Sequence, residues 1–518
     1  MSTTMQTTNL PNAINSGAGP SPPVGSFANL TLSPKCAEYV SSAHPLHTGN
    51  PLNDALPVAK SDQDWYVQLA NGVPLDPSQR TLDAYLRSYF VANMKHLFIP
   101  TAQHIKLARR IDQLIRMGYR YRHPSSPQRA ALLQETYEKA QAAGKAVKMV
   151  FNETRPISTF SLIGHSGAGK STTVEAILGA YQQCIFHPSL NITQIVWLKV
   201  DCPKDGSVKE LALSILRAFD EVLGTQFAPE RDARVTATML TSRVNHLAVA
   251  HHLGILVIDE LQNLSVKKSG GREEMLNWFQ ELVNQIRLPV FVLGTYKARK
   301  VLQLDLRHAR RLSVVGSEVW DPLKRGPDFD QLVSNLWRYL LLREPGELSE
   351  DMRTAIHEET QGIRAFIVDM FVVAQLHALG KGLETMTPGL FRTVAREEFA
   401  AVQPMLHALR SKDPNRIGRF EDLLSYQVDE YIERARNLIT AGSGATPAAA
   451  DPGASILGRA CVAVASYTGL TAPDAKKLVL KVMDGSHGSA RALTRAAIAR
   501  YEQEVEGDGS AEGNQDAL

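Results

Sequence analysis

The chain has 518 residues, of which 44% are hydrophobic and 21% are charged, and this is the composition of an ordinary globular protein. Its net charge of +3 excludes a uniformly basic nucleic-acid-binding protein and leaves only local basic patches for such a role. No apolar run reaches the length of a membrane-spanning helix, so we expect no membrane association and a cytoplasmic location. The length predicts several domains.

The N-terminal part of the chain divides into a polar segment and a helical segment. Residues 1–59, which begin with a stretch rich in Ser, Thr, Pro and Gly, are expected to be mostly disordered. Residues 60–148 show apolar side chains at helical spacing, most clearly in a helix that begins at Ala102. The basic residues of this helix and its exit predict either a solvated face or a phosphate-contacting surface: Lys106, Arg109, Arg110, Arg116, Arg120, Arg122 and Arg129.

Residues 164–171 read GHSGAGKS and match the phosphate-binding P-loop at every fixed position. Strand-forming residues precede the loop and a helical pattern follows it, which is the context that such a loop needs. The glycines let successive N–H groups point at one anion, Lys170 is expected to reach the β- and γ-phosphates, and Ser171 is expected to hold Mg²⁺. The predicted nucleotide-binding residues are Gly164, His165, Ser166, Gly167, Ala168, Gly169, Lys170, Ser171 and Thr172.

Between residues 149 and 325 the pattern alternates between strand and helix, which predicts a parallel α/β sheet with helices on both faces. The expected strands lie at 159–163, 195–200, 254–260 and 289–295, and the expected helices at 207–222, 231–251 and 273–286. The third strand is apolar and ends in Asp259 and Glu260. With a P-loop upstream, this pair predicts a hydrolysis site in which Asp259 holds Mg²⁺ and Glu260 is the general base.

Four more side chains are candidates for the same site. Thr295 ends the next strand, where it could bind the γ-phosphate or the lytic water, or else cap the following helix. Arg310 and Arg311 are candidates for an arginine finger supplied to a neighbouring subunit, and the alternative is a basic surface cluster that binds nothing. Arg364 opens a helix in an all-α region, from which it could reach the nucleotide as part of a lid.

The last part of the chain is predicted to be helical and then to lose order. Residues 326–440 are expected to form a helical lid and extension. An Ala-, Gly- and Pro-rich linker follows at 441–454, and a small helical module at 455–505. The polar, acidic residues 506–518 are expected to be disordered.

Taken together, the P-loop, the 258–260 strand end, Thr295, the arginines after it and the segment 362–364 resemble a AAA+ ATPase. The resemblance implies an α/β P-loop core with an α-helical N-terminal region and a helical lid. More narrowly, the chain is similar to the TnsC/TniB regulators of bacterial DNA transposition. The segments that carry the narrower resemblance are 97–100, 118–124, 195–207, 256–265 (LVIDELQNLS), 275–284 (MLNWFQELVN) and 292–296 (VLGTY).

The narrower resemblance implies a protein that binds ATP and Mg²⁺ at subunit interfaces and oligomerises on duplex DNA with little sequence specificity. The oligomer would be a closed ring or an open helical filament with about six or seven subunits a turn. It would link a target-selecting protein to transposase subunits and hydrolyse ATP to disassemble, in the bacterial cytoplasm at the nucleoid. Phosphate contacts are expected from Lys204, Lys209, Thr236, Lys267 and Lys268.

Two other functions are compatible with the same core. A replication initiator or helicase loader would usually carry a winged-helix domain after the lid, and residues 455–505 show no convincing wing. A signalling or adaptor NTPase would bind protein partners without DNA. ATP-dependent DNA binding therefore separates the adaptor from the other two functions.

Overall fold

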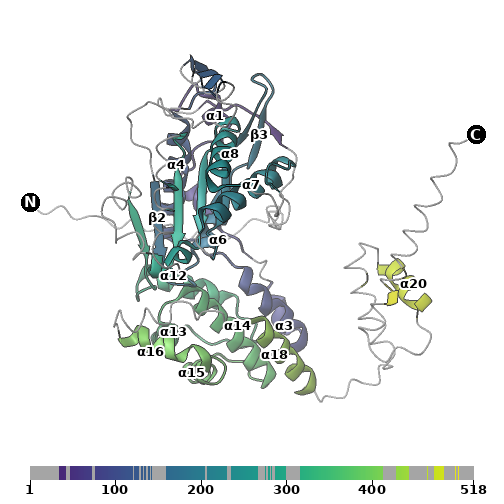
Figure 1. Ribbon diagram of the computed structural model, residues 1–518. Helices are drawn as coiled ribbons and strands as arrows, with labels where there is room; N and C mark the ends of the chain where they lie inside the picture. Colours follow the sequence, from purple (N-terminus) through teal and green to yellow (C-terminus); the bar gives the residue numbers. More distant parts are fainter. Residues whose placement is uncertain are drawn as a thin grey trace, which may run out of the picture. The chain divides into compact units, whose positions relative to one another are not determined.

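The fold is given by a computed structural model of the chain, shown in Figure 1. It describes residues 34–41, 47–72, 76–120, 122–127, 159–204, 207–229, 235–265, 286–298, 316–411, 428–442 and 472–482, with scattered positions in 130–142, 275–282 and 464–500. The chain divides into two compact units, Met1–Arg436 and Asn437–Leu518. The second unit contains helix α20 (Ala472–Val482).

Five parallel strands form the central sheet of the first unit, in the order β5-β6-β7-β2-β8. Their bounds are β2 (Thr159–Gly164), β5 (Trp197–Asp201), β6 (Ile255–Asp259), β7 (Val290–Gly294) and β8 (Ser317–Trp320). The predicted parallel α/β fold is confirmed. Because parallel strands end at one edge, the P-loop after β2 lies at the same edge as the ends of β6 and β7.

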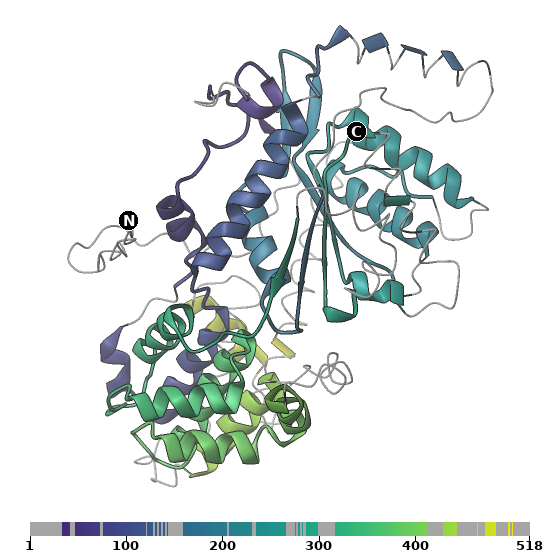
Figure 2. The same ribbon diagram turned by 90° about the vertical axis from the view of Figure 1, so that its left-hand side faces the viewer.

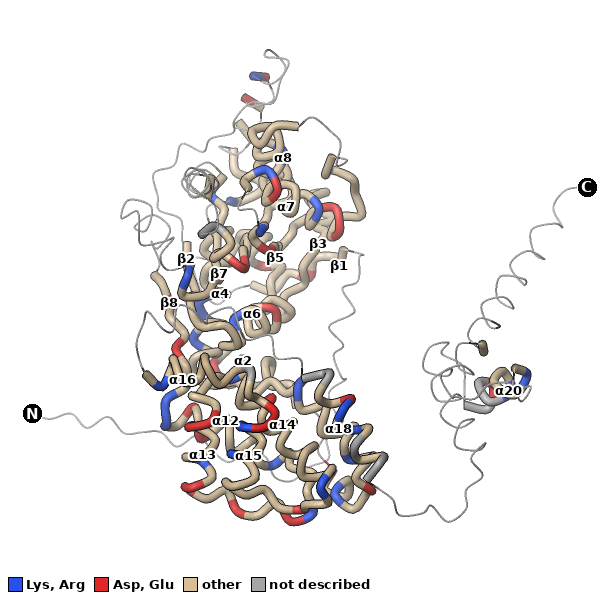
Figure 3. Tube along the Cα trace, turned by 60° about the horizontal axis from the view of Figure 1, so that its bottom comes forward, with Lys and Arg blue, Asp and Glu red and all other residues tan. Residues whose placement is uncertain are grey.

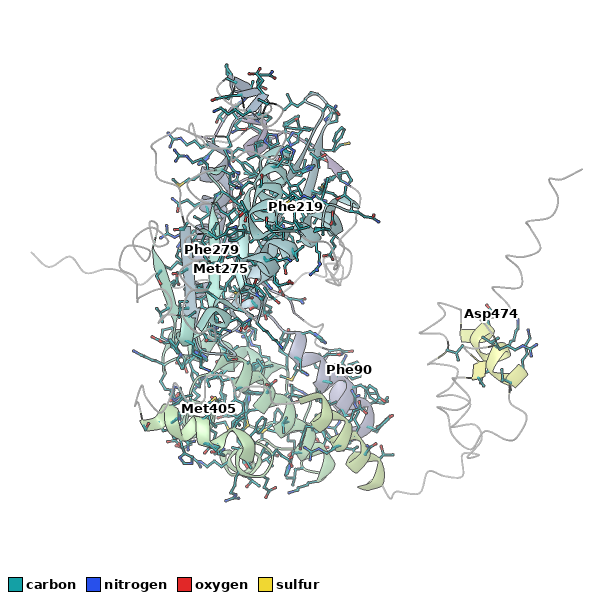
Figure 4. The ribbon with its side chains drawn as sticks, viewed as in Figure 1. Phe90, Phe219, Met275, Phe279, Met405 and Asp474 are labelled. Atoms are coloured by element: carbon teal, nitrogen blue, oxygen red, sulfur yellow. The ribbon has the colours of Figure 1, made fainter. Side chains whose placement is uncertain are left out.

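Helices cover both faces of the sheet, as Figure 2 shows for α4 on one side and the α7–α8 pair on the other. The first face packs against α4 (Ala102–Arg120) and α6 (Lys170–Leu178), and the second against α7 (Val208–Leu223) and α8 (Ala237–Ala250). The second layer also contains Phe219, Met275 and Phe279, which Figure 4 labels. Side chains of β6 alternate between the two cores, as expected for a strand buried on both faces.

The strand predicted at 195–200 corresponds to β5 from Trp197 onward, but its first residue, Ile195, belongs to a different strand. Strand β4 (Ile192–Ile195) ends where β5 begins, and β4 pairs antiparallel with β3 (Cys184–His187). Strand β1 (Lys35–Cys36) adds to β3 and completes a small three-stranded sheet. At Val196 the chain changes partner, because its N–H donates to Gln183 while its carbonyl accepts from Ile255, where the β6 ladder begins. The apolar run at 195–198 crosses this break without interruption, so the sequence pattern does not show it.

The N-terminal segment is more ordered than expected. Helix α1 (Pro51–Asp54) lies within the range expected to be mostly disordered, yet Leu52 and Leu56 are buried in the core that α4 shares with α2 (Asp62–Leu69). Two of the basic residues after Ala102 are structural. Arg116 pairs with Asp112 at 2.9 Å, and Arg122 donates to the carbonyls of Leu253 and Gly254.

The helices expected to form the lid make a second helical region of the first unit, and the last of them, Val428–Gly442, extends into the second unit. They are α12 (Pro327–Arg338), α13 (Glu350–Thr360), α14 (Arg364–Gly380), α15 (Pro388–Glu397), α16 (Gln403–Ser411) and α18 (Val428–Gly442). Helix α3 (Ala84–Ala92), although far upstream, packs against α14. Short 3-10 turns are η1 (Pro77–Thr81), η2 (Asn93–His96), η3 (Leu261–Ser265) and η4 (Ala400–Val402). Acidic and basic residues are interspersed over this region in Figure 3.

Two further observations concern the helices. In the described ranges no single helix is long and apolar enough to cross a membrane, and α13 with α14 meets that test only as a pair bent by 116°. The helix expected at 231–251 begins at Ala237, with residues 231–234 outside the described ranges. The helix expected at 273–286 falls mostly outside those ranges as well.

Candidate functional site

The P-loop joins β2 to α6 and presents its backbone at the carboxyl edge of the sheet. Gly169 has a φ of +80°, a left-handed conformation that glycine adopts without strain, and it lies directly before α6. Lys170 is buried, and its Nζ donates to the carbonyls of Gly164 at 2.9 Å and His165 at 2.8 Å. The ammonium is therefore held inside the loop that is predicted to receive phosphate.

The two predicted metal ligands are in direct contact. Ser171 Oγ donates to Asp259 Oδ2 at 2.6 Å, although the two residues are 88 positions apart in the chain. Asp259 is buried at the end of β6, and its Oδ1 accepts from the Glu260 N–H at 2.8 Å. A hydroxyl and a carboxylate are the hard oxygen ligands that Mg²⁺ prefers, so this donor set fits the ion.

A lysine stands beside these oxygens. Lys199 on β5 lies 2.9 Å from Glu175, 3.4 Å from Asp259 and 3.8 Å from Asp201, measured from its Nζ to the nearest carboxylate oxygen. Burial disfavours its charged form, but the hydrogen bond to Glu175 and the charges of the three carboxylates outweigh burial and raise the pKa of Lys199. The side chain therefore carries a fixed positive charge at neutral pH.

Glu260 directly follows β6, and Gln262 contacts its side chain. Its φ of +57° is unusual for a residue with a side chain, and such strain is concentrated at functional sites. Gln262 Nε2 donates to the Glu260 carboxylate, while Gln262 Oε1 accepts from the Thr295 N–H at 3.0 Å. Burial, together with the negative charges of Asp259 and Asp201, raises the pKa of Glu260. Gln262 thus joins the predicted base to the end of β7.

Thr295 follows β7, which lies between β6 and β2. Its Oγ1 is buried and has no hydrogen-bond partner among the described residues. The alternative of a helix-capping hydroxyl receives no support from this geometry, since the hydroxyl makes no such bond there. A buried hydroxyl without a partner is free to bond to a ligand.

The lid touches the P-loop through the first residues of α14. The Ala365 N–H donates to the Gly167 carbonyl at 3.1 Å. Gly362 approaches the chain so closely that a Cβ there would lie 1.9 Å from the Leu323 carbonyl oxygen, so only glycine fits. Arg364 donates to Thr101 at 3.2 Å and Gln103 at 3.1 Å, and burial lowers its pKa to about 10.

His165, the second residue of the P-loop, is buried. Burial is the main cause that lowers its pKa to about 4, and the positive charges of Lys170 and Arg364 act in the same direction. The imidazole is therefore neutral at physiological pH. Arg364 is thus close enough to the P-loop for its charge to act on a loop side chain.

The remaining predicted residues are spread more widely. Lys204 is exposed after β5, Lys209 lies in the first turn of α7, and Thr236 is exposed and caps α8 by accepting from the Met239 N–H at 3.3 Å. Ser166 and Thr172 lie at the surface of the loop and of α6. The predicted positions outside the described ranges are Arg310, Arg311, Lys267 and Lys268.

Sequence reasoning missed two residues of the site, Lys199 and Gln262. A signal existed for Lys199, because a charged residue inside an otherwise apolar strand must face a partner. Gln262 follows the Asp259–Glu260 pair by two positions, which places it within reach of the carboxylate. The Lys199–Asp259 contact and the Gln262–Thr295 contact could not be assigned without knowing the strand order.

One family model covers the part of the chain that holds this site. Residues 158–302 match the AAA domain family, and no curated protein matches the chain. Among solved structures, the Walker-type ATPase of Pyrococcus abyssi is 16% identical over 61% of this chain and 88% of its own, with a TM-score of 0.34. The Aeropyrum pernix ORC1 protein, solved in complex with DNA, is 14% identical over 73% and 83%, with a TM-score of 0.33. Cdc6p from Pyrobaculum aerophilum is 13% identical over 76% and 98%, with a TM-score of 0.35. The matched segment holds the P-loop, Asp259, Glu260 and Thr295, and the chain thus contains a AAA domain, a nucleotide-binding P-loop ATPase core.

Proposed function

We propose that the chain hydrolyses ATP at the carboxyl edge of its sheet and uses the ATP-bound state to assemble on duplex DNA as a regulator of transposition. The observation that carries the ATPase part is the 2.6 Å hydrogen bond between Ser171 and Asp259, with Glu260 next in the chain. The P-loop supplies donors for phosphate, and the adjoining strand end supplies a candidate base. These are the parts that hydrolysis of a phosphoanhydride needs.

Each residue has a distinct role in the proposed reaction. Lys170 would exchange its two loop carbonyls for phosphate oxygens, and Ser171 and Asp259 would hold Mg²⁺, which neutralises the charge that develops on the phosphates. Glu260 would orient and deprotonate the attacking water, and its raised pKa makes it a stronger base than an ordinary glutamate. The unpartnered Thr295 hydroxyl would bond to the γ-phosphate or to that water.

The lid would change position in response to nucleotide bound in the P-loop. Arg364 begins the helix whose second residue donates to Gly167, so nucleotide in the P-loop would act on the lid through this contact. Arg310 or Arg311 would complete the site of a neighbouring subunit as an arginine finger. In such an arrangement ATP stabilises the oligomer, and hydrolysis releases it.

The transposition part of the proposal is supported by the segments 195–207, 256–265, 275–284 and 292–296, which resemble TnsC/TniB regulators. Under this proposal the protein links a target-selecting protein to transposase subunits. Its DNA contacts would be made to phosphates, with Lys204, Lys209, Thr236, Lys267 and Lys268 as the candidates.

Sedimentation with duplex DNA of random sequence tests this proposal. We expect the full chain to co-sediment with DNA in the presence of ATP or a non-hydrolysable analogue, and to be released with ADP. Binding should weaken steeply with added salt, because phosphate contacts release counterions. ATP hydrolysis without nucleotide-dependent DNA binding would instead indicate a signalling or adaptor NTPase. Binding to a replication origin alone would indicate an initiator.

A further inference from the structure

The cation beside the predicted metal ligands has no role in the reaction described above. Lys199 is the third residue of β5, and its register partner on β6 is Val257, two positions before Asp259. Its side chain is only 17% exposed, so its charge is poorly screened by water.

Lys199 approaches the same oxygen that Ser171 uses. Asp259 Oδ2 accepts from Ser171 Oγ at 2.6 Å and lies 3.4 Å from Lys199 Nζ. The other oxygen of Asp259 accepts the Glu260 N–H. A lysine and a serine thus both approach the carboxylate oxygen that is the candidate ligand for a divalent cation.

Lys199 also has other partners. Glu175 on α6 lies closest to the ammonium at 2.9 Å, and Asp201, two residues along the same strand, lies at 3.8 Å. Both are more exposed than Asp259, with side-chain exposures of 52% and 69% against 5%. The lysine can therefore give up its contact with Asp259 and remain paired.

We propose that Lys199 is a built-in cation that occupies Asp259 in the nucleotide-free protein and lowers the affinity of this site for a divalent metal ion. The metal is then retained only when phosphate oxygens of a nucleotide add to its ligands. The chain would bind metal and nucleotide together, and it would lose both after hydrolysis. This inference rests on the proposed metal-binding role of Ser171 and Asp259.

The size of the effect follows from like-charge repulsion. A unit charge and a divalent ion a few ångströms apart repel even in a partly hydrated site, and we expect the repulsion to lower metal affinity by about tenfold. A purely structural role for Lys199, in which it only orients Asp259, makes the opposite prediction. Loss of an orienting partner would weaken metal binding.

Binding of Mn²⁺ to the full chain, followed by electron paramagnetic resonance of the free ion, separates these two roles without relying on turnover. Wild-type protein is compared with Lys199→Met and Lys199→Arg, each alone and with a non-hydrolysable ATP analogue. We expect Lys199→Met to bind Mn²⁺ about tenfold more tightly than wild type in the absence of nucleotide. Lys199→Arg, which keeps the charge, should match wild type. Unchanged or weaker binding by Lys199→Met would overturn the inference.

A second variant keeps the test decisive if Lys199→Met fails to fold. Glu175→Gln removes the closest partner of Lys199 and leaves the ammonium with Asp259, so Mn²⁺ binding should weaken about threefold or more. The matched control is Asp201→Asn, which removes an equal charge from a carboxylate 3.8 Å from the ammonium and should weaken Mn²⁺ binding less, so equal effects of the two changes would contradict the inference. Wild-type protein that binds no Mn²⁺ even with nucleotide would overturn the proposed metal site itself. Mn²⁺ binding that is the same with and without Lys199 would overturn only the inference about Lys199.

Discussion

Arg87 on α3, which packs against the lid, and Lys199 beside the P-loop are both cations that contact carboxylates, and their contacts differ. Arg87 is 2% exposed at its side chain and forms two bonds to Glu384, at 2.7 and 2.6 Å, plus one to the Leu341 carbonyl. Hydrogen bonds from Arg87 are the main cause that lowers the pKa of Glu384, and the exposed Arg343 lies farther from the same carboxylate, at 3.8 Å. Lys199 instead shares three carboxylates, each at a different distance.

The difference indicates what each region is built for. The Arg87–Glu384 pair joins α3 to the lid, and the two charges balance each other without a ligand. At the carboxyl edge of the sheet three carboxylates surround Lys199, while the Lys170 ammonium donates to two carbonyls of its own loop. A nucleotide bound with a metal ion would supply phosphate oxygens to Lys170 and a cation to the carboxylates at the same time. The charge pair in the first region therefore stabilises the fold, whereas the charges in the second region are suited to bind a ligand.

The substitution Glu260→Gln should give the largest effect, and it acts only on the second region. Loss of the base should lower the rate of ATP hydrolysis by about 100- to 10,000-fold while nucleotide binding is kept. Single-turnover hydrolysis and binding of a fluorescent ATP analogue measure the two quantities on one preparation. An unchanged hydrolysis rate would show that another group acts as the base.

Substitution of Arg87 by Met tests the first region. It keeps a similar side-chain volume but leaves Glu384 without its partner, so the free energy of unfolding should fall by about 3 kcal/mol. Urea unfolding of the full chain measures this loss. The matched control is Arg343→Met, because Arg343 is 55% exposed and lies 3.8 Å from the same carboxylate. That change should cost less than about 1 kcal/mol. Equal costs for the two arginines would remove the contrast between the regions.

Gln262→Leu should have a smaller effect, visible in the pH dependence of hydrolysis. The Gln262 amide donates to the Glu260 carboxylate and so favours its charged form, and its loss should raise the pKa of Glu260 further. A base works only when deprotonated, so the fall in rate on the acid side should begin at higher pH in the variant. The rate at high pH should fall about tenfold at most, since the base itself remains. A pH–rate profile that does not move would mean that Gln262 only supports the fold.

Much of the fold and the candidate site could be predicted from local sequence. The P-loop, the apolar strand that ends at Asp259 and the strand that ends at Thr295 each carry their own pattern, and parallel pairing brings their ends together. The break at Val196 could not be predicted, because the apolar run at 195–198 crosses it and only the pairing partners differ on its two sides. Lys199, Gln262 and the Arg87–Glu384 pair act through contacts between distant parts of the chain, which hydrophobic periodicity does not encode.

Binding of ATP to wild-type protein and to Lys170→Ala tests the central claim most directly, because Lys170 is the charge that the P-loop holds for phosphate. Titration with a fluorescent ATP analogue should show saturable binding to the wild type, and about 100-fold weaker binding to the variant, whose free energy of unfolding should be nearly unchanged. Equal affinity of the two proteins for ATP, or no binding by the wild type, would contradict the assignment of this site.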